Sequence, residues 1–281
     1  MTPTLTTITP YWGRPEALKR WLSAISDATV EGVHHYLFDI GGEVEWVSKE
    51  FEEYNITSFS LPDTQDNRSI GRIHNMGISI ARSEWVMKLD IDALPNDRYF
   101  ENLMPILEGA GEREWFNGGM LYLNNEWCRN EWPKDGYIDD EFYTRTMNNR
   151  LKSTWKSSEP DASNFIVRRN EYMDLGGTEN RFQGYGWEDC QVTYMLEAHQ
   201  QGKCPLGGRG VDFHNCTSRC RDEIYRPKAK QLFERDHFLC LLHYYHDNSP
   251  DRIYRNQPQM NNNRAILHNY IKAKQKVISE F

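Results

Sequence analysis

The chain has 281 residues, 38% of them hydrophobic and 13% aromatic, and its formal net charge at pH 7 is −8. This composition excludes a mainly disordered chain and favours one large α/β domain, or one domain with an extension. No apolar run approaches the roughly 20 residues that a membrane-spanning helix needs. The N-terminal stretch MTPTLTTITPYWG has no basic segment followed by an apolar one. We therefore expect a cytoplasmic protein whose six cysteines are thiols.

The first third of the chain alternates between strand and helix patterns. LTTITP (5–10) is rich in β-forming residues, and PEALKRWLSAI (15–25) has apolar residues at helical spacing and a proline in its first turn. Similar patterns predict strands over 34–42, 56–63 and 84–92 and helices over 44–54 and 69–83. This order predicts an α/β fold with a mostly parallel, twisted sheet and helices on both faces. Ligands of such sheets bind beyond the carboxyl ends of the strands.

The rest of the chain is less regular. From Arg219 to the end, 12 Lys and Arg stand against 7 Asp and Glu, a balance of +5 beside −13 in the preceding part. A basic segment of this kind indicates either an anionic partner or a solvated helical face. We predict a domain over 1–218 and a basic helical extension over 219–281. The expected elements are a helix over 95–109, Trp-rich strands and loops over 112–160, a strand and helix within 162–177, a turn and helix within 182–202, a strand over 211–215, and helices over 227–246 and 263–278.

The stretch VMKLDIDALP ends a buried strand on two like charges, Asp90 and Asp92. Two such carboxylates are costly in an apolar surrounding unless a cation neutralises them. Residues two apart on an extended segment share a face, so both side chains can reach one ion with oxygen ligands. The pattern therefore indicates a divalent-cation site, although a helix-capping Asp followed by a turn Asp would give the same letters.

The stretch GYGWEDCQV combines glycines, aromatic rings and acids. Tyr185 and Trp187 offer flat apolar faces beside Gly186, while Glu188 and Asp189 stand where a helix begins and where its dipole favours carboxylates. A carboxylate at this position can act as a general base. A capped helix start would explain the acids but not the alternating glycines and aromatic residues. Farther on, His214 in VDFHN is either a metal ligand or an ordinary strand histidine.

Taken together, these motifs resemble those of GT-A glycosyltransferases. The resemblance covers about residues 4 to 215, and GYGWED is similar to the C-terminal motif of the galactosyltransferase and polypeptide GalNAc-transferase groups. It implies a Rossmann-like nucleotide-binding half over 1–110 and an acceptor-binding half over 111–218. It also implies a nucleoside-diphosphate sugar donor, with UDP preferred, and Mn²⁺ or Mg²⁺ as cofactor.

Carried over residue by residue, the resemblance gives each candidate a role. Asp189 is the preferred base of an inverting reaction, Glu188 a ligand of a sugar hydroxyl, and Tyr185, Gly186 and Trp187 line the acceptor pocket. Relatives often have two glycines before the acids, so Trp187 puts the shape of that pocket in question. The donor would contact Pro10, Tyr11, Arg14, Asp39, Arg72 and Asp90, and the metal would bind Asp92, His214 and Asp90.

The acceptor stays open at this point. It is a saccharide, a hydroxylated base in DNA, or a protein. DNA would suit the basic tail and the many aromatic residues, whereas the net charge of −8 argues mildly against it. Two other classes of function remain: a metal-dependent phosphodiesterase that uses Asp90, Asp92 and His214, and a non-catalytic module that binds nucleotide sugars or carbohydrate.

Overall fold

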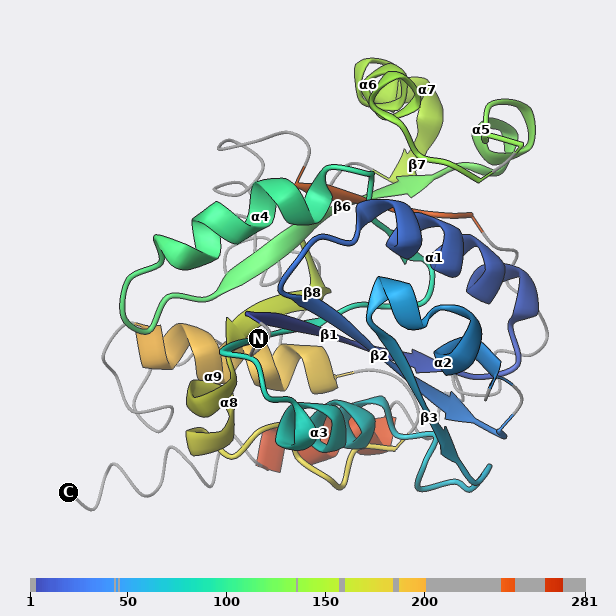
Figure 1. The fold of residues 1–281 in the computed structure, drawn as a ribbon. Helices are drawn as coiled ribbons and strands as arrows, with labels where there is room; N and C mark the ends of the chain where they lie inside the picture. The colour runs from blue at the N-terminus through green and yellow to red at the C-terminus, as the bar shows by residue number, and fades with distance from the viewer. Residues whose placement is uncertain are drawn as a thin grey trace.

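The computed structural model describes residues 4–42, 44, 46–134, 136–156, 160–183, 187–200, 239–245 and 261–269. In this part of the chain, nine strands form one sheet (Figure 1). They are β1 (Leu5–Tyr11), β2 (Val33–Ile40), β3 (Ile56–Leu61), β4 (Trp85–Lys88), β5 (Ala93–Leu94), β6 (Phe116–Leu123), β7 (Thr154–Lys156), β8 (Pro160–Arg168) and β9 (Cys240–His243). Their order is β3-β2-β1-β4-β8-β6-β9-β5, and β7 pairs with β6.

Six of these nine described strands run in the same direction. The first four, β3, β2, β1 and β4, pair in parallel. On the other side of the antiparallel strand β8, β6 resumes this direction, and β9 pairs in parallel with β6. The strands β8, β7 and β5 run the opposite way. The predicted α/β fold with a mostly parallel sheet is therefore confirmed.

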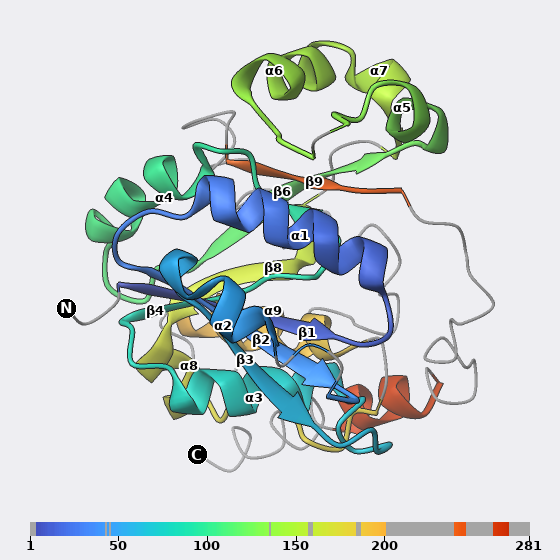
Figure 2. The ribbon, with the colours of Figure 1, turned by 45° about the vertical axis from the view of Figure 1, so that its right-hand side comes forward.

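Helices cover both faces of the sheet, as predicted (Figure 2). One face packs against α1, α2 and α4, and the other against α3, α8 and α9. No helix of the described residues is both long enough and apolar enough to cross a membrane. The helices are α1 (Pro15–Ala28), α2 (Trp46–Glu50), α3 (Ile70–Ile80), α4 (Tyr99–Glu108), α5 (Asn125–Asn130), α6 (Asp140–Asn148), α7 (Arg150–Ser153), α8 (Arg169–Asp174), α9 (Glu188–Gln200), a 3₁₀ turn at Glu52–Tyr54, and residues 261–269.

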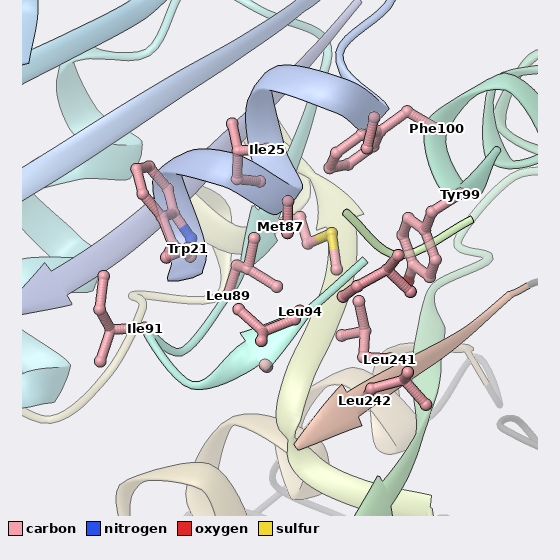
Figure 3. Close-up of a cluster of buried hydrophobic side chains, with 14 of the residues drawn as sticks. Trp21, Ile25, Met87, Leu89, Ile91, Leu94, Tyr99, Phe100, Leu241 and Leu242 are labelled. Atoms are coloured by element: carbon pink, nitrogen blue, oxygen red, sulfur yellow. The ribbon is translucent and has the colours of Figure 1, made fainter. Parts of the chain in front are cut away.

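The larger core lies between the sheet and the helices α1 and α4 (Figure 3). Trp21 of α1 and Phe100 of α4 are fully buried there, together with Met87 of β4. Leu241 and Leu242 of β9 join the same cluster. A segment from the last part of the chain is thus built into a core whose other buried members lie between Leu5 and Ile166.

The strand β4 divides its side chains between the two cores. Trp85 and Met87 belong to the core under α1 and α4, whereas Val86 belongs to the core under α3, α8 and α9. Because successive side chains of a strand point to opposite faces, Lys88 follows Val86 onto the second face. This alternation directs a lysine into the space beside the start of α9.

The structure corrects several element boundaries. The strand predicted over 84–92 ends at Lys88, so Asp90 and Asp92 lie in the turn that follows. The helix predicted over 44–54 is divided into α2 and the 3₁₀ turn. The helix predicted over 227–246 is wrong at its end, where residues 240–243 form β9, because a short apolar run fits a buried strand as well as a helix.

The helix at 261–269 returns to the domain and holds the segment before α9. Asn263 is fully buried, its Nδ2 donates to the Gln183 carbonyl at 2.8 Å, and its Oδ1 accepts from the Gln183 N–H at 3.1 Å. One side chain thereby satisfies both polar groups of a backbone unit, as a neighbouring strand would. The helix predicted over 263–278 is present at residues 263–269, the part of it that the structure describes.

The close packing of α3 on the sheet generates a stability prediction. A Cβ on Gly77 would lie 2.7 Å from Ile8 Cγ2 and 2.9 Å from Phe38 Cε2. The overpacking in Gly77→Ala costs about 1–3 kcal/mol, more than the roughly 1 kcal/mol that alanine gains in a helix. We expect urea unfolding to show a lower free energy of unfolding. Ser79→Ala on the exposed face of α3 is the control and should change it by less than about 0.5 kcal/mol. A G77A variant as stable as the wild type would contradict this packing.

Candidate active site

A buried lysine stands at the centre of the candidate site. The Lys88 side chain is 2% exposed, and its Nζ lies 2.5 Å from Asp189 Oδ1 and 3.9 Å from Asp90 Oδ1. Lysine is almost never fully buried unless it is paired, and these two carboxylates supply the pairing. Burial alone would lower the pKa of Lys88, but the carboxylates of Asp189, Asp90 and Glu188 outweigh it and raise the pKa above its ordinary value. Lys88 is therefore a permanent cation.

Glu188, the neighbour of Asp189 at the start of α9, is in a different state. It is 2% exposed, and its carboxyl oxygens have no hydrogen-bond partner among the described residues. Burial raises the pKa of Glu188 to about 8, and the adjacent Asp189 carboxylate adds to the rise while Lys88 opposes it. At neutral pH Glu188 is therefore mainly protonated, whereas Asp189 is the acid of the pair that forms the ion pair with Lys88.

Asp92 lies in the same turn after β4 as Asp90, and it contacts two other basic groups. Its Oδ2 accepts a hydrogen bond from Arg14 Nη1 at 2.8 Å and lies 3.6 Å from His243 Nε2. Arg14 immediately precedes α1, and His243 is the last residue of β9. The backbone of this region is fixed as well, because the Tyr244 N–H donates to the Asp92 carbonyl at 3.1 Å. The carboxylate at 92 is thus paired from two distant parts of the chain.

The other predicted donor residues divide into two groups. Pro10 and Tyr11 end β1, and Tyr11 is the register partner of Asp39, which is near the end of β2. The Asp39 carboxylate is fully buried, and its Oδ2 accepts the Val44 N–H at 2.8 Å. These residues meet at the carboxyl edge of the parallel strands, as expected. Arg72, by contrast, lies on α3 with its side chain 47% exposed, and it forms an ion pair with Asp66 at 3.0 Å.

Only part of the predicted acceptor motif lies in the described chain. Tyr185 and Gly186 lie outside the described residues, as does the predicted metal ligand His214. Trp187 is described, and its φ of 76° lies in the left-handed region that bulky residues seldom adopt. The guanidinium of Arg264 stands over its ring, 5.6 Å from the centroid. Trp187 therefore has a backbone conformation typical of glycine, and its ring contacts the C-terminal helix.

A further buried imidazole faces the same interior. His74 of α3 is 1% exposed, and its Nε2 has no hydrogen-bond partner among the residues that the structure describes. Burial, assisted by the charge of Lys88, lowers the pKa of His74 well below its ordinary value. His74 is therefore neutral, and the cation that faces the acidic pair from the sheet is Lys88.

Sequence reasoning missed Lys88 and His243. A signal for Lys88 was present, because a lysine within the apolar letters VM-LDI must either leave the core or find a carboxylate. His243 gives no such signal, because the CLLH pattern fits a helix as well as a strand and nothing in the local sequence pairs it with β5.

A divalent cation fits the donor set of this turn in part. Asp90 and Asp92 offer carboxylate oxygens and His243 an imidazole nitrogen, all suitable for Mn²⁺ or Mg²⁺. The described residues contain no group of three or more His, Cys, Asp or Glu arranged to hold an ion. Such ions commonly bind to one or two carboxylates and take further ligands from substrate phosphates and water. The turn therefore suits an ion completed by a bound phosphate.

Residues 43–204, more than half of the chain, match the family model described as glycosyltransferase like family 2. No curated protein matches the chain.

Several solved structures are similar to the chain at low identity. S. aureus TarS with UDP is 14% identical, with a TM-score of 0.46 over 69% of this chain and 54% of that one. GalNAc-T7 with UDP, GalNAc and Mn²⁺ is 14% identical, with a TM-score of 0.46 over 70% of this chain and 41% of that one. The mannosyltransferase PcManGT from Pyrobaculum calidifontis, with GDP-Man and Mn²⁺, is 14% identical, with a TM-score of 0.43 over 100% and 79%. The chain spans about half the length of the TarS structure.

The state of Glu188 generates a prediction about pH. Its pKa is 4.5 when unperturbed and about 8 in the fold, so between these values the unfolded chain is ionised at this carboxyl and the folded chain is not. The stability that Glu188 contributes is therefore complete below pH 4.5 and is lost as the pH rises through 8. Urea unfolding across this range should show the wild type losing stability relative to Glu188→Gln as the pH rises.

The control is Glu101→Gln, an exposed position on α4. Its difference in unfolding free energy from the wild type should stay small across the same range. A difference between the wild type and E188Q that does not vary with pH would contradict a buried, protonated Glu188.

Proposed function

This chain belongs to the glycosyltransferase like family 2, and we propose that it transfers a glycosyl group from a nucleoside-diphosphate sugar to an acceptor hydroxyl. One observation carries the proposal for this site. Asp90, from the turn predicted to serve the donor, and Asp189, from the motif predicted to serve the acceptor, are both ion-paired with Lys88. Two motifs about a hundred residues apart in sequence therefore meet at one buried cation, as a transfer between two substrates requires.

The donor would bind along the carboxyl edge of the parallel strands. The neighbouring ends of β1 and β2 bring Pro10, Tyr11 and Asp39 to the place where this class of sheet binds a nucleoside. Arg14, which reaches Asp92, supplies positive charge toward the diphosphate. Arg72 would have to exchange its exposed pairing with Asp66 for a phosphate, which costs little because such surface pairs are weak.

One or two of Asp90, Asp92 and His243 would hold a divalent cation at the donor, with the remaining ligands supplied by substrate phosphates and water. When bound, Mn²⁺ or Mg²⁺ would neutralise charge on the departing diphosphate. The chain itself contributes a fixed carboxylate pair, with Asp92 held by Arg14 and Asp90 near Lys88. His214 remains a proposed ligand from the sequence motif.

On the acceptor side, Asp189 acts as general base. It takes the proton of the acceptor hydroxyl as that oxygen forms a bond to the anomeric carbon, and the bond from this carbon to the diphosphate oxygen breaks. A single displacement of this kind inverts the anomeric configuration. The Asp189 side chain is 17% exposed, so a substrate can reach it. Glu188 is mainly protonated and buried, so its role as a ligand of a sugar hydroxyl is proposed from the sequence motif alone. Tyr185, Gly186 and Trp187 would line the acceptor.

A donor panel tests the function itself. We expect wild-type protein with Mn²⁺ to release nucleoside diphosphate slowly from at least one of a set of UDP- and GDP-sugars, and chelation to abolish release. Asp92→Ala should lower this release about 10²-fold, since it removes fixed charge at the donor. No release from any donor would favour a binding module. Cleavage of phosphoesters without a sugar donor would favour a phosphodiesterase.

Asp189→Asn tests the base. Its kcat should fall by about 10²–10⁴-fold while KM for the donor changes little, because a base acts on the transition state. Asp174→Asn, an exposed acid on α8, is the matched control and should keep wild-type kcat. An unchanged kcat in D189N, with release intact in the wild type, would remove Asp189 from the mechanism.

The acceptor is a saccharide or a hydroxylated base in DNA. Salt-dependent retention on DNA bearing hydroxymethylated bases, and transfer to it, would support the second. Transfer to oligosaccharides without retention on DNA would support the first.

A further inference from the structure

We propose that Lys88 is a positioning residue for glycosyl transfer: it fixes the Asp189 carboxylate relative to Asp90, so that base and donor are aligned before the acceptor arrives. This inference rests on the proposed function. It assigns a role to a residue that belongs to neither the acidic turn nor the acidic pair.

Burial makes Lys88 a positioning group rather than a substrate ligand. Its side chain is 2% exposed, compared with 17% for Asp189 and 30% for Asp90. An ammonium has three N–H donors, and Asp189 Oδ1 at 2.5 Å receives one of them. The two carboxylates therefore remain accessible from outside while the cation that holds them is covered by protein.

Lys88 is anchored on a rigid element. Its strand β4 lies inside the sheet, paired with β1 on one side and β8 on the other. Side chains mounted on such elements are held more accurately than side chains on loops. Asp90, two residues later, follows this strand directly, so the distance between Lys88 and the donor turn is set by a short piece of backbone.

The start of α9 is held in place by contacts with α3 and with the segment before it. A Cβ on Gly71 of α3 would lie 2.4 Å from Thr178 Cγ2 and 3.6 Å from Glu188 Cβ. The helix α3 therefore packs so closely here that only glycine fits at position 71. Gln191 of α9 also donates to the Gly177 carbonyl at 3.1 Å. With helix and strand both fixed, the ion pair between Lys88 and Asp189 determines where the base points.

The same cation is ion-paired with Asp189, the acid of the pair that we propose as the base. Asp189 interacts with Lys88 from β4, Glu188 on its own helix and Tyr172 from α8. His74 from α3 interacts with Lys88. Burial makes His74 neutral and raises the pKa of Tyr172 to about 12, and Glu188 is mainly protonated. Among these groups Lys88 supplies the positive charge, and removing it would leave the Asp189 side chain without its fixed partner.

The test compares Lys88→Met, Lys88→Gln and Lys88→Arg for release of nucleoside diphosphate from the best donor of the panel. We expect K88M and K88Q to lower kcat about 10²-fold, the size of the loss when a reacting group is misplaced by about 1 Å, with KM for the donor nearly unchanged. K88R should recover part of the loss because it keeps the charge with another shape. If K88M does not fold, K88Q is judged by the same criterion.

A double-mutant comparison and a buried control separate positioning from stability. In the D189N background, K88M should lower kcat no further, because Lys88 acts through Asp189. Ser83→Ala removes a buried hydroxyl that donates to Thr6 Oγ1 at 2.8 Å just before β4, and it should lower Tm without lowering kcat. Three results would overturn the role of Lys88: kcat within about threefold of the wild type in K88M or K88Q, an equal loss in the D189N background, or an equal loss in S83A.

Release by the wild type distinguishes failure of the proposed function from failure of the role of Lys88. Release by the wild type together with an unaffected K88M overturns only the role of Lys88. Absence of release by the wild type with every donor overturns the proposed function, and the role of Lys88 with it.

Discussion

The ion pair between Lys88 and Asp189 is the contact on which the candidate site depends. It joins the end of a central strand to the first turn of α9, and both partners are largely covered. A buried pair of this kind is not in itself evidence of stability, because the cost of removing two charges from water is large. Breaking it leaves one charge buried without its partner, which is costly. The pair therefore specifies a geometry, with strand, turn and helix in one arrangement.

Charge balance explains how the acidic turn persists at the end of a buried strand. Asp92 is neutralised by Arg14, and Asp90 and Asp189 share Lys88. Glu188 avoids the problem by remaining mainly protonated. In these ion pairs of the described residues, Arg14 and Lys88 therefore offset the three carboxylates of Asp90, Asp92 and Asp189.

Local patterns were sufficient for most of the fold because its first half consists of alternating strands and amphipathic helices. The helix at Pro15–Ala28 and the turn with Asp90 and Asp92 follow from spacing and from where strands end. Contacts between distant segments could not be predicted. Nothing near LDID indicates that Arg14 or His243 pairs with Asp92, and nothing in CLLH indicates a place between β6 and β5. Lys88 is the exception, because a lysine between apolar residues already predicts a carboxylate partner.

The segment after residue 239 completes the site from outside the region that matches the family. That match ends at residue 204, yet His243 of β9 lies beside Asp92 and Asn263 holds the backbone of Gln183. Trp187 has a left-handed backbone that costs of the order of 1–3 kcal/mol in a residue other than glycine. Its ring rests against Arg264 of the same C-terminal helix, and this contact helps to offset the strain. The donor turn thus contacts residues 239–245, and the described part of the acceptor motif contacts residues 261–269, so removing both stretches would disturb both sides of the site.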